Sequence, residues 1–202
     1  FHRGDVKMSS RHAVWDRTAD QVRFEGDFRL VHPSGRLTAA NGRYERSSGS
    51  AWAEGNAHLQ DTSGRTTLDA GVIRYDRTAR RAESFSAPVF RRISGTGIVR
   101  DTTQITADQL VWRETDSVAE ANGRVRLIRG KLVATCASAK LDQKTRKLTL
   151  EGSPLATMQK RTLSGKSMIL DVDLKKERIE KVLVLKDARG DVTGDPDTAG
   201  VT

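Results

Sequence analysis

One short pattern recurs six times along this chain of 202 residues. Each copy is marked by a large apolar or aromatic anchor residue, followed in five copies by an acidic residue; the anchors are Trp15, Tyr44, Tyr75, Trp112, Leu141 and Leu170. The intervals between successive anchors are 29, 31, 37, 29 and 29 residues. A fixed period of this length predicts a chain built from repeated supersecondary units, each burying its apolar side against its neighbours.

Two further columns of small residues keep the same register. Eleven residues after the first five anchors come Gly26, Gly55, Ser86, Gly123 and Gly152. A Ser-Gly pair follows at 34–35, 63–64, 94–95 and 164–165, with Arg129-Gly130 in its place in the fourth copy. Because glycine reaches positive φ without steric cost, the Ser-Gly column predicts tight turns.

The segment "VRFEGDFRL", residues 22–30, alternates apolar and charged side chains, as a half-buried strand does. Gly26 falls on the apolar side, between Phe24 and Phe28. The alternation therefore predicts that the glycine column faces inward. There it would let the strand bend, leave volume for a ligand between apolar neighbours, or do both.

Each unit contains two strands and two turns, so six units predict about twelve short strands in antiparallel hairpins with one apolar face, an all-β fold. We expect a single domain over residues 1–190 and a flexible tail over 191–202, which has almost no apolar content. A helix competes only at 174–183, where the repeat favours a turn followed by a strand.

The formal net charge is +9. Such a charge attracts phosphate groups of nucleic acids or lipids, although cations at alternate strand positions and in turns, such as Arg124, Arg126, Arg129 and Lys131, also serve simply to solvate an outer face. No nucleic-acid-binding motif accompanies the charge, so we expect no nucleic-acid partner.

Residues that carry catalysis are not grouped in the sequence. The four histidines lack metal-ligand spacing, and Cys136 lies on the apolar side of its strand, where it is expected to be a small buried residue. We predict no enzyme, no cofactor and no metal site. The longest apolar runs, such as 182–185, are too short to cross a membrane.

Residues 111–184 resemble the OstA-like domain of the lipopolysaccharide transport proteins. The resemblance is an anchor with an acid, an alternating run ending in Gly-x-Val-x-Leu, a further strand and Gly-x-Pro. It is carried by Trp112, Ala119, Gly123, Val125, Leu127, Leu132, Ala134, Leu141, Asp142, Leu150, Gly152 and Pro154. "FEGDFRL" and "AEGNAHL" match more loosely and extend it over most of residues 12–188. Arg113, where an acid is expected, and Ser86, where glycine is expected, depart from the pattern.

This resemblance implies an open, twisted, V-shaped β-jellyroll in the periplasm that carries the acyl chains of lipopolysaccharide along its interior. An amino-terminal signal or anchor removed before Phe1 is part of that expectation. The family includes a soluble bridge, a membrane-anchored component and a translocon domain, and the sequence does not choose among them. The expected lipid-binding groove is lined by Val22, Phe24, Gly26, Phe28, Leu30, Leu59, Leu68, Ile105, Ala121, Gly123, Val125, Leu127, Leu132, Leu148 and Leu150.

The expected partners are lipopolysaccharide, whose phosphorylated head group an arginine-rich rim would hold, and related jellyroll domains or further copies that stack on the edge strands. The alternative is a structural adaptor that binds partner proteins through exposed strand edges and has a filled interior with no lipid. A dry, packed core would favour that alternative.

Overall fold

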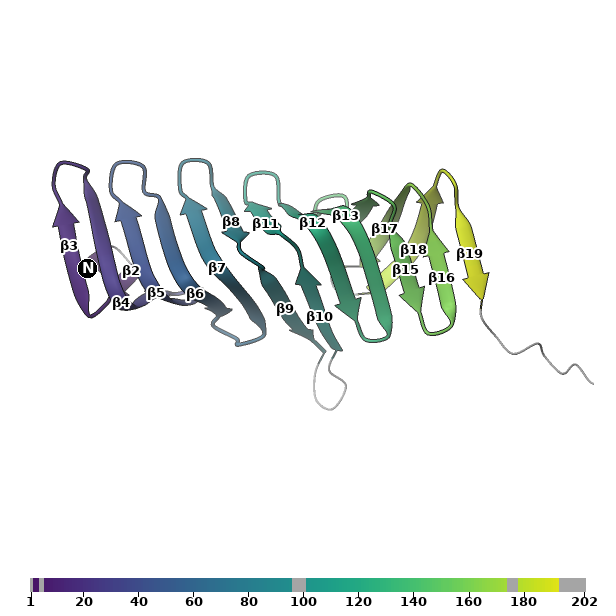
Figure 1. The fold of residues 1–202 in the computed structure, drawn as a ribbon, viewed down its shortest axis with the longest axis horizontal. Coiled ribbons are helices and arrows are strands. Elements are labelled where there is room, and N and C mark those ends of the chain that lie inside the picture. Colours follow the sequence, from purple (N-terminus) through teal and green to yellow (C-terminus); the bar gives the residue numbers. More distant parts are fainter. Residues whose placement is uncertain (1, 4–5, 96–100, 174–177, 193–202) are drawn as a thin grey trace, which may run out of the picture.

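The computed structural model describes residues 2–3, 6–95, 101–173 and 178–192. Over this part the regular structure is one 19-stranded antiparallel sheet, with no helix, which confirms the all-β prediction. The molecule is elongated along the stack of strands, with the N-terminus at one end and β19 at the other (Figure 1). The described residues include no helix long and apolar enough to cross a membrane.

The strands of the first half are β1 (His2–Arg3), β2 (Val6–Ser9), β3 (His12–Asp16), β4 (Gln21–His32), β5 (Gly35–Glu45), β6 (Ala51–Asp61), β7 (Thr66–Asp76), β8 (Arg81–Phe85) and β9 (Val89–Ser94). Those of the second half are β10 (Asp101–Thr106), β11 (Gln109–Arg113), β12 (Val118–Arg129), β13 (Leu132–Asp142), β14 (Lys147–Glu151), β15 (Leu155–Met158), β16 (Arg161–Ser164), β17 (Ser167–Asp173), β18 (Arg178–Leu185) and β19 (Arg189–Val192).

Strands β2 to β19 form twelve passes, a pass being one crossing of the sheet by the chain. β1 is a short additional strand that pairs with β2. β4, β5, β6, β7, β12 and β13 each run the full width of the sheet, whereas the other passes break in the middle into two strands, such as β8 with β9 and β14 with β15. The expected number of strands is therefore right for the passes. The expected hairpins appear as β4 with β5, β6 with β7 and β12 with β13.

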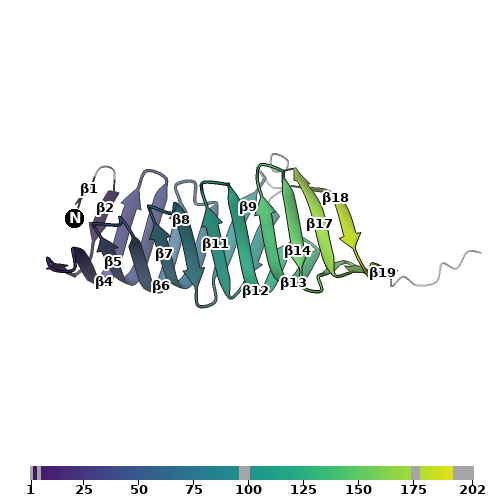
Figure 2. The same ribbon diagram turned by 90° about the horizontal axis from the view of Figure 1, so that it is seen from above.

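The breaks divide the sheet into two half-sheets that share the six long strands. Half-sheet A contains β3, β8, β11, β14, β17 and β18, with the adjoining halves of the long strands. Half-sheet B contains β1, β2, β9, β10, β15, β16 and β19, with the other halves. Seen from above, the strands lie in two layers (Figure 2). The fold is thus the open, bent sheet that the sequence predicts.

The glycine column marks the bend between the half-sheets. Gly26 and Asp27 both have positive φ, 71° and 53°, and together oppose a single residue of β5, so the register shifts there. The same pair of positive φ values recurs at 55–56, 86–87, 123–124 and 152–153. Two successive residues in this conformation form a β-bulge that turns the strand sharply. The sequence therefore located five bends correctly.

A sixth bend lies at Lys186 and Asp187, whose φ values are 58° and 52°. Neither residue is glycine, and the pair falls later than the spacing of the other five predicts, so the sequence pattern did not include it. Left-handed conformations are less common for residues with a side chain but are accessible to them. The repeat therefore continues to the end of the described chain.

Three of the six bends are clamped by the same pair of contacts on the outer face. The backbone N–H of Arg11 donates to the carbonyl of Gly26 at 2.8 Å, and its guanidinium pairs with Asp27 at 2.6 Å. At another bend the backbone N–H of Asp108 donates to the carbonyl of Gly123. The carboxylate of Asp108 accepts a bond from Arg124 Nε at 2.9 Å, so the two charges are exchanged relative to Arg11 and Asp27. At the sixth bend the backbone N–H of Lys166 donates to the carbonyl of Lys186 at 3.0 Å, and its ammonium group pairs with Asp187 at 3.1 Å. The outer-face charges of these residues therefore hold the bend.

Two details differ from the sequence prediction. Ser164-Gly165 lies at the break between β16 and β17, and the hairpin of that unit is instead formed by the two residues between Met158 and Arg161. β19 extends through Val192 and pairs with β16, so the first two residues of the expected tail are part of the sheet. The expected strand after the turn near 174 is present as β18, while the turn residues 174–177 and the tail residues 193–202 lie outside the described residues.

Candidate functional site: the apolar inner face

The inner face of half-sheet A carries a continuous line of cross-strand neighbours, which we call the central row. It consists of Ala13, Phe24, Gly42, Ala53, Ile73, Ser84, Leu110, Ala121, Ala139, Leu150, Met168 and Val184. Each member is paired with the next, and all but Ser84 are apolar or glycine. Cross-strand pairs of this kind stabilise a sheet. The row runs the whole length of the half-sheet.

The six anchors of the sequence repeat lie in a parallel row two residues further out. This anchor row contains Trp15, Val22, Tyr44, Ala51, Tyr75, Ala82, Trp112, Ala119, Leu141, Leu148, Leu170 and Val182. Because the repeat is about 29 residues long, every second strand contributes an anchor, and all six anchors fall in this one row. Tyr44 and Leu170 are buried, whereas Trp15 is exposed on the edge strand β3.

Half-sheet B has a matching line on its inner face, the opposing row. Its members are Met8, Leu30, Leu37, Leu59, Leu68, Phe90, Ile105, Leu127, Ala134, Ala156, Leu163 and Gly190. It contains no polar side chain. Two apolar rows, one on each half-sheet, therefore extend from one end of the molecule to the other.

Residues from both half-sheets pack together in three clusters. The first joins Val22, Phe24 and Phe28 with Met8 and Ile73, and Leu30 and Leu68 pack against it. The second contains Leu150 with Met168, and Leu127 and Leu148 pack against it. The third contains Ala121 and Val125, with Ile105 beside it. Eleven of the fifteen expected groove residues thus belong to these clusters, and a twelfth, Leu59, lies in the opposing row; whether any of them contacts lipid remains a prediction.

The other three are Gly26, Gly123 and Leu132, of which Leu132 lies half-buried on the inner face and neither glycine faces inward. A Cβ built on Gly26 would meet the side chain of Arg11, 3.1 Å away, and one on Gly123 would meet the carboxylate of Asp108, both exposed outer residues. The predicted inward orientation is therefore wrong, because the bulge at each bend rotates the strand by the extra residue.

One glycine that does face inward is Gly42, which no column of the repeat contains. It pairs with Phe24, and a Cβ placed on it would lie 2.5 Å from the ring of Phe28. The Phe24 and Phe28 rings pack with centroids 5.3 Å apart. The missing side chain near Phe24 is therefore that of Gly42 and not, as expected, that of Gly26, and the Phe28 ring fills its place.

Ser84 interrupts the central row. It is fully buried between Ile73 and Leu110, and its Oγ has no hydrogen-bond partner. It also lies where the first cluster ends and the third begins. A buried hydroxyl without a partner costs free energy, because the hydrogen bonds that it makes with water in the unfolded chain are lost.

Replacing Ser84 by alanine is therefore expected to raise the free energy of unfolding by about 1 kcal/mol, since the desolvation cost is removed without a large change in volume. Chemical denaturation monitored by tryptophan fluorescence measures the change. The matched control is Ser50→Ala, for which no such gain is expected: Ser50 is also buried, but its hydroxyl is not among the buried side-chain atoms that lack a hydrogen-bond partner. A loss of stability in Ser84→Ala would contradict this account.

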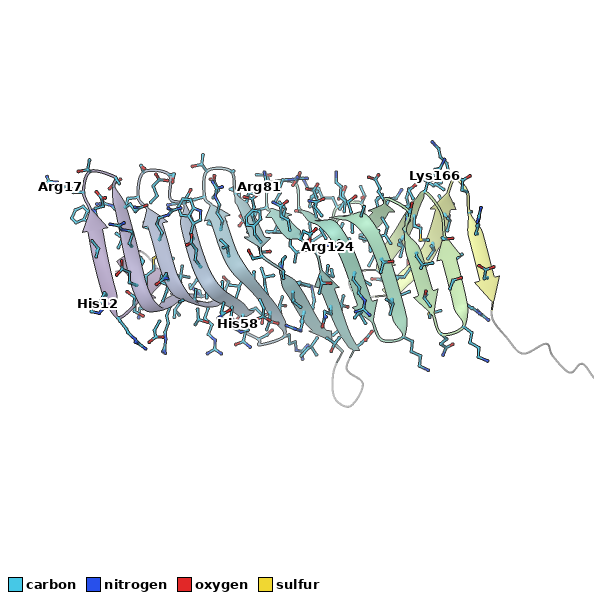
Figure 3. All side chains as sticks on the ribbon, in the orientation of Figure 1. His12, Arg17, His58, Arg81, Arg124 and Lys166 are labelled. Carbon is cyan, nitrogen blue, oxygen red and sulfur yellow. The ribbon has the colours of Figure 1, made fainter. Side chains whose placement is uncertain are left out.

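Several arginines of the expected arginine-rich rim are paired with carboxylates. Arg129 bonds Asp101 at 3.0 Å, and Arg113 bonds Glu120 at 2.9 Å. The bond to Glu120 raises the pKa of Arg113. Labelled cations are spread from one end of the molecule to the other rather than gathered in one patch (Figure 3). The arginines in these pairs therefore stabilise the sheet.

Asp69, His58 and Arg91 form a group of charged side chains on the outer face of half-sheet B. Asp69 accepts from Arg91 at 2.6 Å and bonds His58 at the same distance. Burial raises the pKa of the Asp69 carboxyl, but the bonds to His58 and Arg91 outweigh it and lower the value. These side chains are remote from the inner face.

Cys136 lies between the second and third clusters, where burial raises the pKa of its thiol to about 11. It is thus uncharged at neutral pH and packs as the sequence indicates. The described residues contain no group of three potential metal ligands.

The pattern search missed three residues at the C-terminal end of half-sheet B. Met158 and Leu163 flank the β15–β16 hairpin on the inner face and are 50 % and 40 % exposed, and Gly190 lies beside Leu163. The alternation in "LATM" and "RTLS" contains the signal, but the Ser-Gly column predicts the turn at Ser164-Gly165 instead.

No family model matches the chain, and no curated protein matches it. Among solved structures it is similar to LptH, the LptA-homologous periplasmic component of the lipopolysaccharide transport device of Pseudomonas aeruginosa. The identity is 11 %, the TM-score is 0.33, and the alignment covers 73 % of this chain and 82 % of that one. We base the fold on the strand pairing, and the proposal below on the inner face, rather than on this similarity.

Proposed function

We propose that the protein is a periplasmic carrier of lipopolysaccharide that holds lipid A acyl chains against the inner face of its bent sheet. The observation that carries the proposal is the pair of apolar rows, central and opposing, which extend the full length of the molecule on facing half-sheets. The register of the OstA-like motifs supports the same ligand.

The physical requirement for such a carrier follows from the cost of exposing acyl chains to water. Removing one methylene group from water lowers the free energy by roughly 0.8 kcal/mol, so exposing an acyl chain of twelve to fourteen carbons to water costs on the order of 10 kcal/mol. An apolar face with an open side offsets that cost while the polar head group stays in water. Leu163 of the opposing row is exposed, as such a face requires.

The sheet also has unpaired edges at both ends. In half-sheet A the first strand is β3, with exposed Val14 and Trp15, and the last is β18, with exposed Val182 and Leu183. Because the first and last passes run in opposite directions, β18 of one copy and β3 of the next would meet antiparallel. The rows would continue across the junction, with Trp15 beside Val182 and Val14 beside Leu183. We include this stacking in the proposal; it would equally serve a structural adaptor.

The carrier and the adaptor are separated by displacement of a fluorescent acyl probe from the purified full chain. We expect lipopolysaccharide to displace the probe and deacylated lipopolysaccharide, which keeps the sugars and phosphates, to leave it bound. Native mass spectrometry of the same samples reports bound lipid and copy number. A protein that binds no probe but forms concentration-dependent oligomers would be an adaptor, and a monomer at every concentration would overturn the stacking.

A further inference from the structure

The two ends of the inner face differ in how completely they are packed. Met8, the first member of the opposing row, is 7 % exposed, whereas Leu163, near the other end of the same row, is 40 % exposed. In Figure 1 these strands lie at opposite ends of the molecule, β2 at the N-terminal end and β16 at the C-terminal end. The first member of the row is therefore buried and the member next to its C-terminal end is not, while Leu59, between them, is 38 % exposed.

Two inner glycines, one toward each end, differ in a similar way. At Gly42 the missing side chain is replaced by the Phe28 ring, so no volume is left. At Gly190 a Cβ would meet only ordinary contacts, the nearest being 3.5 Å away at Leu163 Cδ2. Gly190 is exposed, so the missing side chain leaves one flank of Leu163 uncovered.

The outermost inner row of half-sheet B also changes character along the molecule. Around the middle it contains Arg92, Thr103 and Arg129, which are polar, and it continues into Leu132 and Met158, which are apolar. The apolar surface therefore widens toward the rim in the last third of the chain. Met158 is half exposed there.

We propose that an acyl chain of an anionic lipid binds over Leu132, Met158 and Leu163, the C-terminal mouth, and that the first cluster, around Phe24 and Phe28, is a closed core that takes no ligand. This inference rests on the proposed carrier function and places its lipid. Beside the C-terminal mouth lies the exposed cation Arg161, which follows Met158 in the outermost row and has no ion pair with any described residue. An aliphatic surface ending at an exposed guanidinium matches an acyl chain with an anionic head.

A second copy of the chain fits this surface less well. The edge beside β16 is already covered by β19, so a strand added at that end would pair with β19 and lie beyond Leu163. The C-terminal mouth is on the inner face rather than at the edge. Edge stacking and lipid binding are therefore compatible.

The test uses cis-parinaric acid, a single-chain anionic amphiphile whose fluorescence rises in apolar surroundings, with the full-length protein. Leu163→Gln is expected to raise the dissociation constant about tenfold, because part of the leucine's burial against the chain is lost. Gly190→Leu, which adds a side chain on the open flank of Leu163, is expected to weaken binding similarly. The matched control is Leu59→Gln, since Leu59 is in the same row, is 38 % exposed and lies in the N-terminal half.

An effect of Leu59→Gln of less than about twofold, with both C-terminal variants impaired, supports the assignment. If Leu59→Gln weakens binding as much as Leu163→Gln, or if the C-terminal variants bind normally, the C-terminal mouth is wrong while the carrier function stands. If the unaltered protein shows no saturable binding of the probe, the carrier function itself fails. Thermal unfolding of each variant verifies that the fold is retained, as expected for exposed positions.

Discussion

Val125→Arg is expected to lower the free energy of unfolding by more than about 3 kcal/mol, because it buries an unpaired charge. Val125 is 2 % exposed and packs with Ala107 and Ala121 beside the bend. The sequence alone favours a milder outcome, in which arginine at Val125 or Phe28 abolishes lipid binding and leaves the sheet folded. The packed interior reverses that expectation, since neither side chain has access to solvent.

Urea denaturation and the far-ultraviolet circular dichroism of the purified variant measure this loss. The matched control is Arg126→Ala, the next residue, which is exposed on the outer face and is expected to change stability by less than about 0.5 kcal/mol. A Val125→Arg protein as stable as the unaltered chain would mean that this part of the interior is open to water, and the groove would then extend further than the C-terminal mouth.

Gly42→Ala is expected to lower the free energy of unfolding by about 2 to 3 kcal/mol, the range for overpacking a core. The added Cβ would lie 2.5 Å from the Phe28 ring, which is itself fully buried and cannot move away without disturbing Phe24. Gly42 is not among the residues with positive φ, so its backbone accepts alanine. Any loss of stability therefore measures the collision with the ring.

Gly190→Ala is the control for this substitution. Gly190 also lies on the inner face without positive φ, but its nearest Cβ contact is an ordinary 3.5 Å, so no comparable loss is expected. In a Phe28→Ala background the cost of Gly42→Ala should fall, since the ring that it would strike is gone; a double-mutant cycle measures that coupling. Additive effects of the two substitutions would contradict the account of Gly42.

Much of the fold follows from features that are local in the sequence. The repeat of about 29 residues located the hairpins, and five bends were found because glycine or serine recurs at one register. The anchors were expected to share a register in the strands, and they do, because antiparallel pairing returns every second pass to the same row. The bend at Lys186 and Asp187 escaped detection, since residues with side chains can also adopt positive φ.

The orientation and exposure of the groove residues could not be predicted from the sequence. Alternation assigned Gly26 and Gly123 to the inner face, and the bulges placed them outside. Leu59 and Phe28 both occupy apolar positions of an alternating pattern. Leu59 is nevertheless partly exposed, whereas Phe28 is buried by its neighbours. Met158 and Leu163, the residues on which the proposed lipid site depends, were not singled out because the hairpin between them carries no Ser-Gly pair.

The sequence by itself determined the repeat, the antiparallel strands, the positions of most bends and the presence of one apolar side, because alternation and turn chemistry act between residues that are close along the chain. Only the tertiary structure decided which way each bend rotates its side chains, which glycine is filled by a ring and which is left open. Those outcomes depend on the added residue in each bulge and on the packing of one half-sheet against the other, which joins residues such as Met8 and Ile73 from distant parts of the chain.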